Sequence, residues 1–295
     1  MSAKPLLSIL KPIIAYAMCL TFMLTATTAA AGKTITYSIP DGGVERIGFN
    51  IKVLKLALKY SGSTYSLQAS PQRNVDQVRA EKLVENGELD LMWSASDSLR
   101  ESRLRLVPIP FDYGLLGYRV LIIPTKDQLK YQSVNRLSDL KQFRPLQGAG
   151  WVDSYILRDA GFDVVLGDYS ELPEQLNKGY GDFIPRSIRE VKDDYTHWSE
   201  TADISIDQRI VLIYKQGDFF YINPDNSELY KDLMLGLTRI YDNGELIKLI
   251  TRHFSERGID LRSEIKNRVS FRLDNPYQSE TVKSIDDRFF NIYFE

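Results

Sequence analysis

The chain has 295 residues, of which 37 are Lys or Arg and 39 are Asp or Glu, so its formal net charge is −2. So mild a charge argues against nucleic acid as a partner, because nucleic acid selects strongly basic surfaces. The chain has one cysteine, Cys19, and two histidines, His197 and His253, which offer little to a transition-metal site. We therefore predict no metal and no cofactor.

The N-terminus has the pattern of a secretory signal peptide. Lys4 and Lys11 flank the start of an apolar segment that ends in the small residues Ala29 and Ala31. A positive start, a short apolar core and an Ala-x-Ala site are typical of such signals, whereas an uncleaved membrane anchor is the alternative. We predict a signal peptide at residues 1–31 and a periplasmic location. The mature chain would then lack cysteine and depend on its hydrophobic core for stability.

The next segment alternates strands with helices. Strands are predicted from alternating polar and apolar residues, and helices from apolar residues spaced three or four apart. The predicted strands and helices, in chain order, are the strand 33–40, the helix 50–62, the strand 64–70, the helix 75–87 and the strand 89–94. Such alternation is typical of a parallel sheet with helices on its faces.

Two apolar segments indicate crossings between two lobes. Residues 104–124 hold three prolines and two glycines around a strongly apolar strand, after which a new series of elements begins. The second apolar run within residues 207–224 is interpreted as the return to the first sheet. We therefore predict an α/β fold in which lobe 1 contains residues 32–111 and 219–295, and lobe 2, residues 112–218, is inserted in it.

The inserted lobe and the C-terminal part repeat the same alternation. A short helix capped by Ser138 precedes a strand at 144–147, and further short helices and strands follow up to Ser187. Residues 227–254 are predicted to be helical with an interruption at Asn243 and Gly244. A polar tail begins near Asn275 and ends in an aromatic-rich stretch.

Three polar segments follow predicted strands, and ligands of parallel α/β folds bind beyond the carboxyl ends of strands. The first follows the strand 89–94 and holds several serines together with Arg100 and Arg103. Hydroxyls hydrogen-bond small polar solutes, and a guanidinium matches a carboxylate with two parallel bonds. The alternative is that a polar residue here caps a short helix, with both arginines in solvent or paired with Glu101.

The other two segments would face the same cleft. In the second, Gly148 and Gly150 allow close approach of backbone to a ligand, and a helix begins near Trp151. Trp151 is a candidate for stacking, and Asp153 for binding an ammonium or for capping the helix. The third ends in Arg186. The alternatives are an ordinary loop for the second segment and a surface charge with a buried stem for the third.

The sequence contains no convincing catalytic motif. A Gly-x-Ser-x-Gly elbow, a Walker-type phosphate loop and a His-Glu-x-x-His pair are all missing from it. We expect the acidic stretch 192–195 to form a solvated face, and His197 and His253 to be structural.

These residues together resemble a known family. The order of the signal peptide, "TITYSIP", "GELDLMWSASDSLRESRLRLVPIPFDYGLLGYRVLII", "LSDLKQF", "GAGW" and "GDFIPRS" is similar to that of the periplasmic solute-binding proteins of the polar amino acid type, family 3. The pieces "GAGWVD", "DFIPRS" and "IKNRVSFRLDNP" resemble an uncharacterised branch of that family. The resemblance implies the two-lobe type II fold, which closes on a solute by hinge bending.

The resemblance also implies roles for individual residues. Arg100 matches the arginine that clamps the carboxylate of the ligand, and hydroxyl and backbone groups of Ser94, Ala95 and Ser96 would add hydrogen bonds. The loop from Gly148 to Trp151 would bind the carboxylate from the other lobe. The family typically has an aspartate for the ligand's ammonium where this chain has Arg186 and Ser187, so the ligand could be more acidic than an ordinary amino acid.

The predicted function is therefore capture of a small polar or anionic solute between two lobes. The expected partners are that solute and an ABC transporter permease, which would be the protein's link to the membrane, and the protein is expected to be a monomer. One alternative is an enzyme of the cyclohexadienyl dehydratase type on the same fold, with Asp153 or Glu101 as the acid or base. Another is a periplasmic sensor module without a transporter.

Overall fold

The computed structural model describes residues 33–40 and 43–290. The predicted signal peptide at 1–31 and the last five residues of the aromatic tail lie outside this part. Residues Thr34–Glu295 form one compact unit, to which the description below applies. No helix in the described part is long and apolar enough to cross a membrane.

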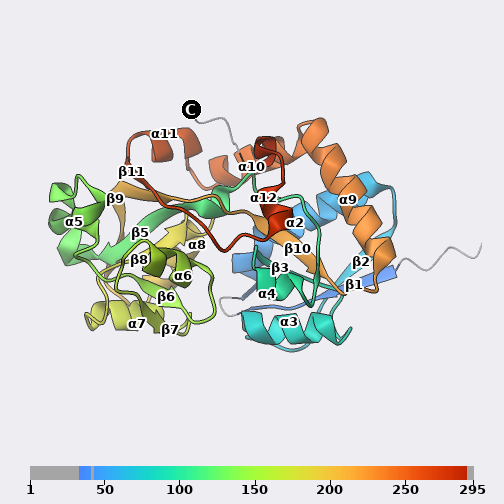
Figure 1. The fold of residues 1–295 in the computed structure, drawn as a ribbon, viewed down its shortest axis with the longest axis horizontal. Helices are drawn as coiled ribbons and strands as arrows, with labels where there is room; N and C mark the ends of the chain where they lie inside the picture. The colour runs from blue at the N-terminus through green and yellow to red at the C-terminus, as the bar shows by residue number, and fades with distance from the viewer. Residues whose placement is uncertain (1–32, 41–42, 291–295) are drawn as a thin grey trace, which may run out of the picture. The chain divides into compact units, whose positions relative to one another are not determined.

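One group of elements, which we call lobe 1, surrounds the three-stranded sheet β3–β10–β4 and the pair β1–β2 (Figure 1). Its strands are β1 (Lys33–Tyr37), β2 (Tyr65–Ala69), β3 (Leu91–Ala95), β4 (Arg105–Leu106) and β10 (Asp218–Ile222). Its helices are α2 (Gly43–Ser61), α3 (Gln77–Glu85), α4 (Ser98–Glu101), α9 (Ser227–Asp242), α10 (Glu245–Ser255) and α12 (Glu280–Lys283).

A second group, lobe 2, surrounds the sheet β11–β9–β5–β8 and the pair β6–β7. Its strands are β5 (Tyr118–Pro124), β6 (Leu146–Gly148), β7 (Val165–Gly167), β8 (Ile184–Ser187), β9 (Ile204–Ile213) and β11 (Val269–Arg272). Its helices are η3 (Thr125–Ser133), α5 (Leu137–Leu140), α6 (Asp153–Asp159), α7 (Leu172–Asn177) and α8 (Val191–Trp198). The short helix η2 (Leu115–Gly117) precedes β5, and α11 (Leu261–Lys266) precedes β11.

The central sheets contain both antiparallel and parallel pairs. Strand β10 runs antiparallel to β3, with Asp218 opposite Ala95 and Ile222 opposite Leu91. Strand β5 is also antiparallel to both β8 and β9, whereas β11–β9 and β6–β7 are parallel. The parallel arrangement predicted for the strands of the first hundred residues does not extend to β10, whose direction the sequence left open. The prediction that the second apolar run returns to the first sheet is confirmed.

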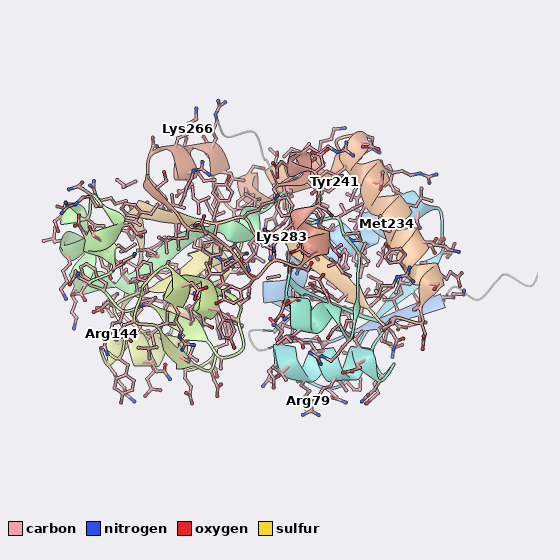
Figure 2. All side chains as sticks on the ribbon, viewed as in Figure 1. Arg79, Arg144, Met234, Tyr241, Lys266 and Lys283 are labelled. Atoms are coloured by element: carbon pink, nitrogen blue, oxygen red, sulfur yellow. The ribbon has the colours of Figure 1, made fainter. Side chains whose placement is uncertain are left out.

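Strand β5 separates two hydrophobic clusters of lobe 2. Leu121 and Ile123 pack into one cluster and Val120 and Ile122 into the other, and all four are at most 1% exposed. Successive side chains of a strand point to opposite faces of the sheet, so a continuous apolar run is what a strand buried on both faces needs. In lobe 1 the largest hydrophobic cluster includes residues of α2, α9 and β10. Charged side chains such as Arg144 and Lys266 point outward from the surface of the structure (Figure 2).

The C-terminal part returns to lobe 2 before it ends on lobe 1. Strand β11 pairs with β9 of lobe 2, although it lies within residues 219–295, which are predicted to belong to lobe 1. The chain then runs back to α12, where Val282 is fully buried in a lobe 1 cluster (Figure 1). The exact lobe boundaries stay a prediction.

We call residues 273–290 the C-terminal strap. The side-chain amides of Asn275 and Gln278 both donate to the backbone oxygen of Lys215, at 3.0 and 2.9 Å. Lys215 lies between β9 and β10, in the second crossing between the lobes. The strap therefore runs against the hinge. The segment that leads to β11 and the strap that returns from it add two connections to the two that the sequence predicts.

Candidate functional site

A pocket of about 750 Å³ lies where strands of both lobes end. It is bounded by the ends of β3, β6 and β8 and by the start of β10. Eight of the nine predicted site residues line it, namely Ser94, Ala95, Arg100, Gly148, Gly150, Trp151, Asp153 and Arg186. Its volume is in the range of small-molecule sites, roughly 300–1,000 Å³.

The ninth predicted residue, Ser96, does not line the pocket. Its hydroxyl donates to Glu101 Oε1 at 2.9 Å, and the residue is buried. The side chain of Asp97 accepts a hydrogen bond from the backbone of Leu99 at 2.8 Å and so caps α4. The cap that was one alternative for this segment therefore exists, and the segment also contributes to the wall of the pocket.

Arg100 extends from α4 into the base of this wall and is 2% exposed. Its Nε donates to Glu81 Oε1 at 2.8 Å, and its Nη1 donates to the backbone oxygen of Ala95 at 2.6 Å. Burial lowers the pKa of the guanidinium, but Tyr221 and Glu81 outweigh this effect and hold the pKa above its ordinary value. Arg100 is thus already neutralised by a carboxylate of α3.

Arg103 points away from the pocket wall. Its guanidinium contacts Glu81 at 2.5 Å and Glu85 at 3.3 Å, both on α3. Its side chain is 36% exposed, so it forms a partly solvated ion pair between the turn after α4 and helix α3.

The glycine-containing loop forms the wall of lobe 2. A Cβ at Gly148 would lie 2.4 Å from the ring of Trp151, so only glycine allows this ring to fold back over the end of β6. The guanidinium carbon of Arg186 lies 4.6 Å from the centre of the same ring. Arg186 therefore lies over the ring of Trp151, and stacking of this ring on a ligand stays a prediction.

Asp153 lies at the first turn of α6 and is 5% exposed. Its Oδ1 contacts Arg119 Nη2 at 2.6 Å and also accepts the hydroxyl of Tyr214. Arg119 comes from β5 and Tyr214 from the residue after β9, and all three side chains are buried. Asp153 thus belongs to a structural ion pair, and its binding of an ammonium stays a prediction.

Arg186 is held by two carboxylates of the following segment. It contacts Asp194 at 2.5 Å and Glu190 at 3.0 Å, and Asp194 also accepts the hydroxyl of Tyr169 at 2.6 Å. Burial lowers the pKa of Arg186, but Asp194 and Glu190 outweigh it and raise the pKa above its ordinary value. Asp194 is 1% exposed, so the expectation that residues 192–195 form a solvated face is wrong for it, because α8 turns this residue toward Arg186.

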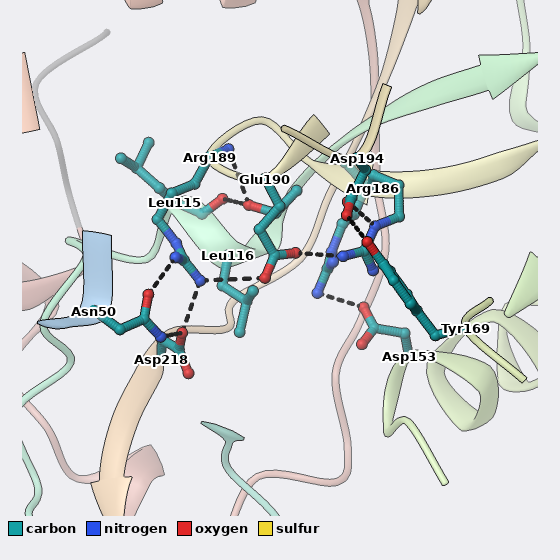
Figure 3. Close-up of polar contacts among 12 residues, drawn as sticks. Asn50, Leu115, Leu116, Asp153, Tyr169, Arg186, Arg189, Glu190, Asp194 and Asp218 are labelled. Atoms are coloured by element: carbon teal, nitrogen blue, oxygen red, sulfur yellow. Dashed lines mark hydrogen bonds and ion pairs between the residues drawn. The ribbon is translucent and has the colours of Figure 1, made fainter. Parts of the chain in front are cut away.

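A line of charged contacts runs along the floor of the pocket from lobe 2 to lobe 1 (Figure 3). Glu190 contacts both Arg186 and Arg189. Arg189 reaches into lobe 1, where it donates to Asn50 at 2.8 Å and to Asp218 at 2.7 Å. These contacts join the segment after β8 to α2 and to the start of β10.

The pocket has balanced charges. Its lining includes the basic residues Arg79, Lys82, Arg100, Arg119 and Arg186 and the acidic residues Asp76, Asp153, Asp168, Glu190 and Asp218. Burial, which Arg189 only partly offsets, raises the pKa of Asp218 to about 7. Burial also raises the pKa of Asp112, which lies beside the first crossing.

The predicted residues therefore come together, but the sequence analysis missed several of their partners. Arg119 and Asp218 lie in apolar strands, Asn50 lies on α2, and Arg189 and Glu190 lie in the turn after β8. A single polar residue in such a segment has no motif around it. Asp218 carried one weak signal, since it is a single acid between a glycine and an aromatic run.

The candidate acids of the dehydratase alternative both have partners in the protein. Asp153 is bound to Arg119 and Tyr214, and Glu101 accepts hydrogen bonds from Ser96 and Tyr221. Within residues 33–40 and 43–290, His, Cys, Asp and Glu side chains form no group of three or more that could hold a metal ion.

Comparisons with known proteins find likeness in structure only. No family model matches the chain, and no curated protein sequence matches it. The structure of an ancestral arginine-binding protein bound to arginine is similar, with 16% identity, a TM-score of 0.54, and coverage of 75% of this chain and 98% of that one. The Salmonella typhimurium periplasmic binding protein described as highly specific for arginine gives 14% identity, a TM-score of 0.53, and coverage of 75% and 99%.

A third similar structure is a histidine kinase sensor domain with similarity to periplasmic binding proteins. It has 11% identity and a TM-score of 0.53, and the match covers 75% of this chain and 95% of that domain. The uncharacterised branch suggested by the sequence stays a prediction, since no sequence match supports it. The chain has the two-lobe α/β fold of the periplasmic binding proteins.

Proposed function

We propose that this protein captures a small polar solute outside the cytoplasm and passes it to a membrane partner, such as an ABC transporter permease, without chemistry of its own. The observation that carries the proposal is the pocket of about 750 Å³ between the strand ends of two lobes. Residues of both lobes line it, so a solute there would touch both and favour the arrangement in which they are close.

The polar groups of this pocket are held in fixed positions. Arg119 and Arg186 of the lining are each 2% exposed and each contacts a buried carboxylate, and Arg189 behind the lining holds Asp218 in the same way. Groups fixed in this way lose little freedom when a solute binds, which favours affinity. Arg100 contributes to the wall, but two of its nitrogens already have partners, so we assign recognition to the pocket as a whole rather than to Arg100 alone.

Thermal unfolding of the purified protein with a panel of solutes tests the proposal. The panel contains L-arginine, agmatine, putrescine, L-glutamine, L-glutamate and succinate. A solute at 100 times its dissociation constant adds about 2.7 kcal/mol to the free energy of unfolding. For a chain of this size the midpoint should rise by roughly 5–10 °C. A midpoint that none of the six compounds moves would contradict the proposal.

A sensor role is a second candidate, which the likeness to the histidine kinase sensor domain supports. Both roles need the same pocket and differ in the membrane protein that reads the bound state. Crosslinking of the solute-loaded protein in intact cells, followed by identification of the attached membrane protein, separates them: a permease supports transport and a kinase or other receptor supports sensing.

A further inference from the structure

Asp218 has one carboxylate oxygen that the protein does not use. It is the first residue of β10, lines the floor of the pocket and is 4% exposed. Its Oδ2 accepts both Arg189 Nη2 at 2.7 Å and Asn50 Nδ2 at 3.3 Å. Its Oδ1 accepts no hydrogen bond from any residue that the structure describes, and in Figure 3 this oxygen points away from Arg189 and Asn50.

Asp153, on the wall of lobe 2, shows the same pattern. Arg119 and Tyr214 both bind its Oδ1, and Oδ2 accepts no hydrogen bond from the described part of the chain. Both residues are buried and line the pocket, so the only partner open to these oxygens is one within the pocket, such as water or a solute. Carboxylate oxygens accept hydrogen bonds from ammonium and guanidinium groups, which are the strongest donors available to a solute.

The three buried arginines of the pocket lining, in contrast, already have carboxylate partners. Arg100 contacts Glu81, Arg119 contacts Asp153, and Arg186 contacts Asp194 and Glu190. The Nε of Arg119 has no partner in the described residues, but this atom is buried. A carboxylate on the solute would have to displace these ion pairs to reach the buried arginines, whereas a cation would add to two carboxylates.

We infer that Asp218 binds an ammonium or guanidinium group of the solute through Oδ1, with Asp153 on the opposite wall, so that the pocket selects cationic solutes. This inference rests on the proposed function, and it departs from the expectation of an anionic solute. Arg186 does not make the site more acid-selective, because Asp194 and Glu190 offset its charge.

Binding should then depend on pH. The charged and titratable groups around Asp218 are Arg189 and Glu190 from the segment after β8 and Asp112 from the first crossing, while the neutral Asn50 comes from α2. His253 also lies near Arg189, but burial lowers its pKa to about 3, so it stays neutral above pH 5. With the pKa of Asp218 at about 7, a cation that needs the ionised form should bind about 25-fold more weakly at pH 5.5 than at pH 7.5.

The test is isothermal titration of the full protein with L-arginine, agmatine and putrescine at both pH values, with L-glutamine and succinate as comparison solutes. We expect at least one cationic compound to bind and succinate not to bind. The Asp218→Asn variant should bind that cation at least tenfold more weakly at pH 7.5 and should lose the pH dependence. Asp225→Asn makes the same charge change beyond the other end of β10, at an exposed residue outside the pocket lining, and should leave affinity within twofold.

Each outcome decides between the two proposals. Binding of only L-glutamine or succinate, or tight binding of a cation by Asp218→Asn, overturns the inference and leaves the proposed function intact. If no solute in the panel binds, the proposed function is contradicted and the inference falls with it. If Asp218→Asn fails to fold, the pH dependence of the wild-type protein still tests the inference, because a constant affinity between pH 5.5 and 7.5 rejects it.

Discussion

Gly117 allows the two crossings that the sequence predicts between the lobes to touch each other. A Cβ at this position would lie 1.9 Å from the backbone oxygen of Tyr214 and 3.2 Å from the backbone nitrogen of Gln216. The backbone oxygen of Gly117 also accepts a hydrogen bond from the nitrogen of Tyr214 at 3.1 Å. Real Cβ atoms essentially never approach closer than 3.0 Å, so Gly117→Ala must push the crossings apart by about 1 Å.

The expected cost follows from these contacts. Overpacking of a buried site costs about 1–3 kcal/mol, and the stretched hydrogen bond to Tyr214 adds about 1 kcal/mol. At roughly 2–4 °C per kcal/mol for a domain of this size, Gly117→Ala should unfold about 5–15 °C below the wild-type protein. Because the change lies at the hinge, it should also weaken solute binding.

Gly48→Ala provides the matched control for a thermal unfolding experiment followed by circular dichroism. Gly48 lies within α2, and a Cβ there would have no neighbour within 4 Å. Alanine is favoured over glycine inside helices by about 1 kcal/mol, so this variant should be as stable as the wild-type protein or more so. If Gly117→Ala unfolds within about 1 °C of the wild-type protein, the close contact of the two crossings is not a constraint and the argument fails.

Two further predictions concern buried charges. Arg186→Met leaves Glu190 and the 1% exposed Asp194 without their partner, so urea denaturation should show a loss of about 3–5 kcal/mol in the free energy of unfolding. The control Lys178→Met removes an exposed pair with Glu174 and should change that free energy by less than about 1 kcal/mol. Equal effects of the two variants would contradict this assignment. Asp218 has a pKa of about 7 when folded, above the ordinary value of about 3.9, so its folded form holds a proton that the unfolded chain releases. The stabilisation that comes from this raised pKa is therefore complete below about pH 4 and is lost as the pH rises to about 7. As the pH rises from 5 to 7.5, the free energy of unfolding of Asp218→Asn should increase by up to about 2–3 kcal/mol relative to that of the wild-type protein. A difference between these two proteins that does not change with pH would show that the carboxyl titrates normally.

The sequence predicts the strands and the loops of the site well, because those features are local. The apolar run of β5 and the glycine of the loop at Gly148 carry their own signal, and so does the switch to polar residues after Ser94. The state of Arg100 could not be predicted, since its partner Glu81 lies on another helix and the ion pair exists only once α3 and α4 pack together.

The sequence could not predict the direction of strand β10 or the buried position of Asp194, and the reason is the same for both. A run of apolar residues predicts a buried strand but says nothing about which neighbour it pairs with or in which sense. Likewise, an acid within "KDDY" is indistinguishable from a surface acid until α8 turns it toward Arg186. What the sequence leaves open is the pairing between distant segments, and this pairing sets the charge of the pocket.

The C-terminal strap changes the mechanics of the hinge. Two adjacent crossings form an axis about which one lobe can rotate, as in hinge-bending proteins generally. Here the segment that leads to β11 also crosses between the lobes, and the C-terminal strap crosses back. The strap is bonded to Lys215 within that axis and has its far end fixed by the buried Val282. Rotation of the lobes must therefore bend four segments together or break the bonds at Lys215, so the joint is a stiffened one that resists twisting and favours small, well-defined movements around the pocket.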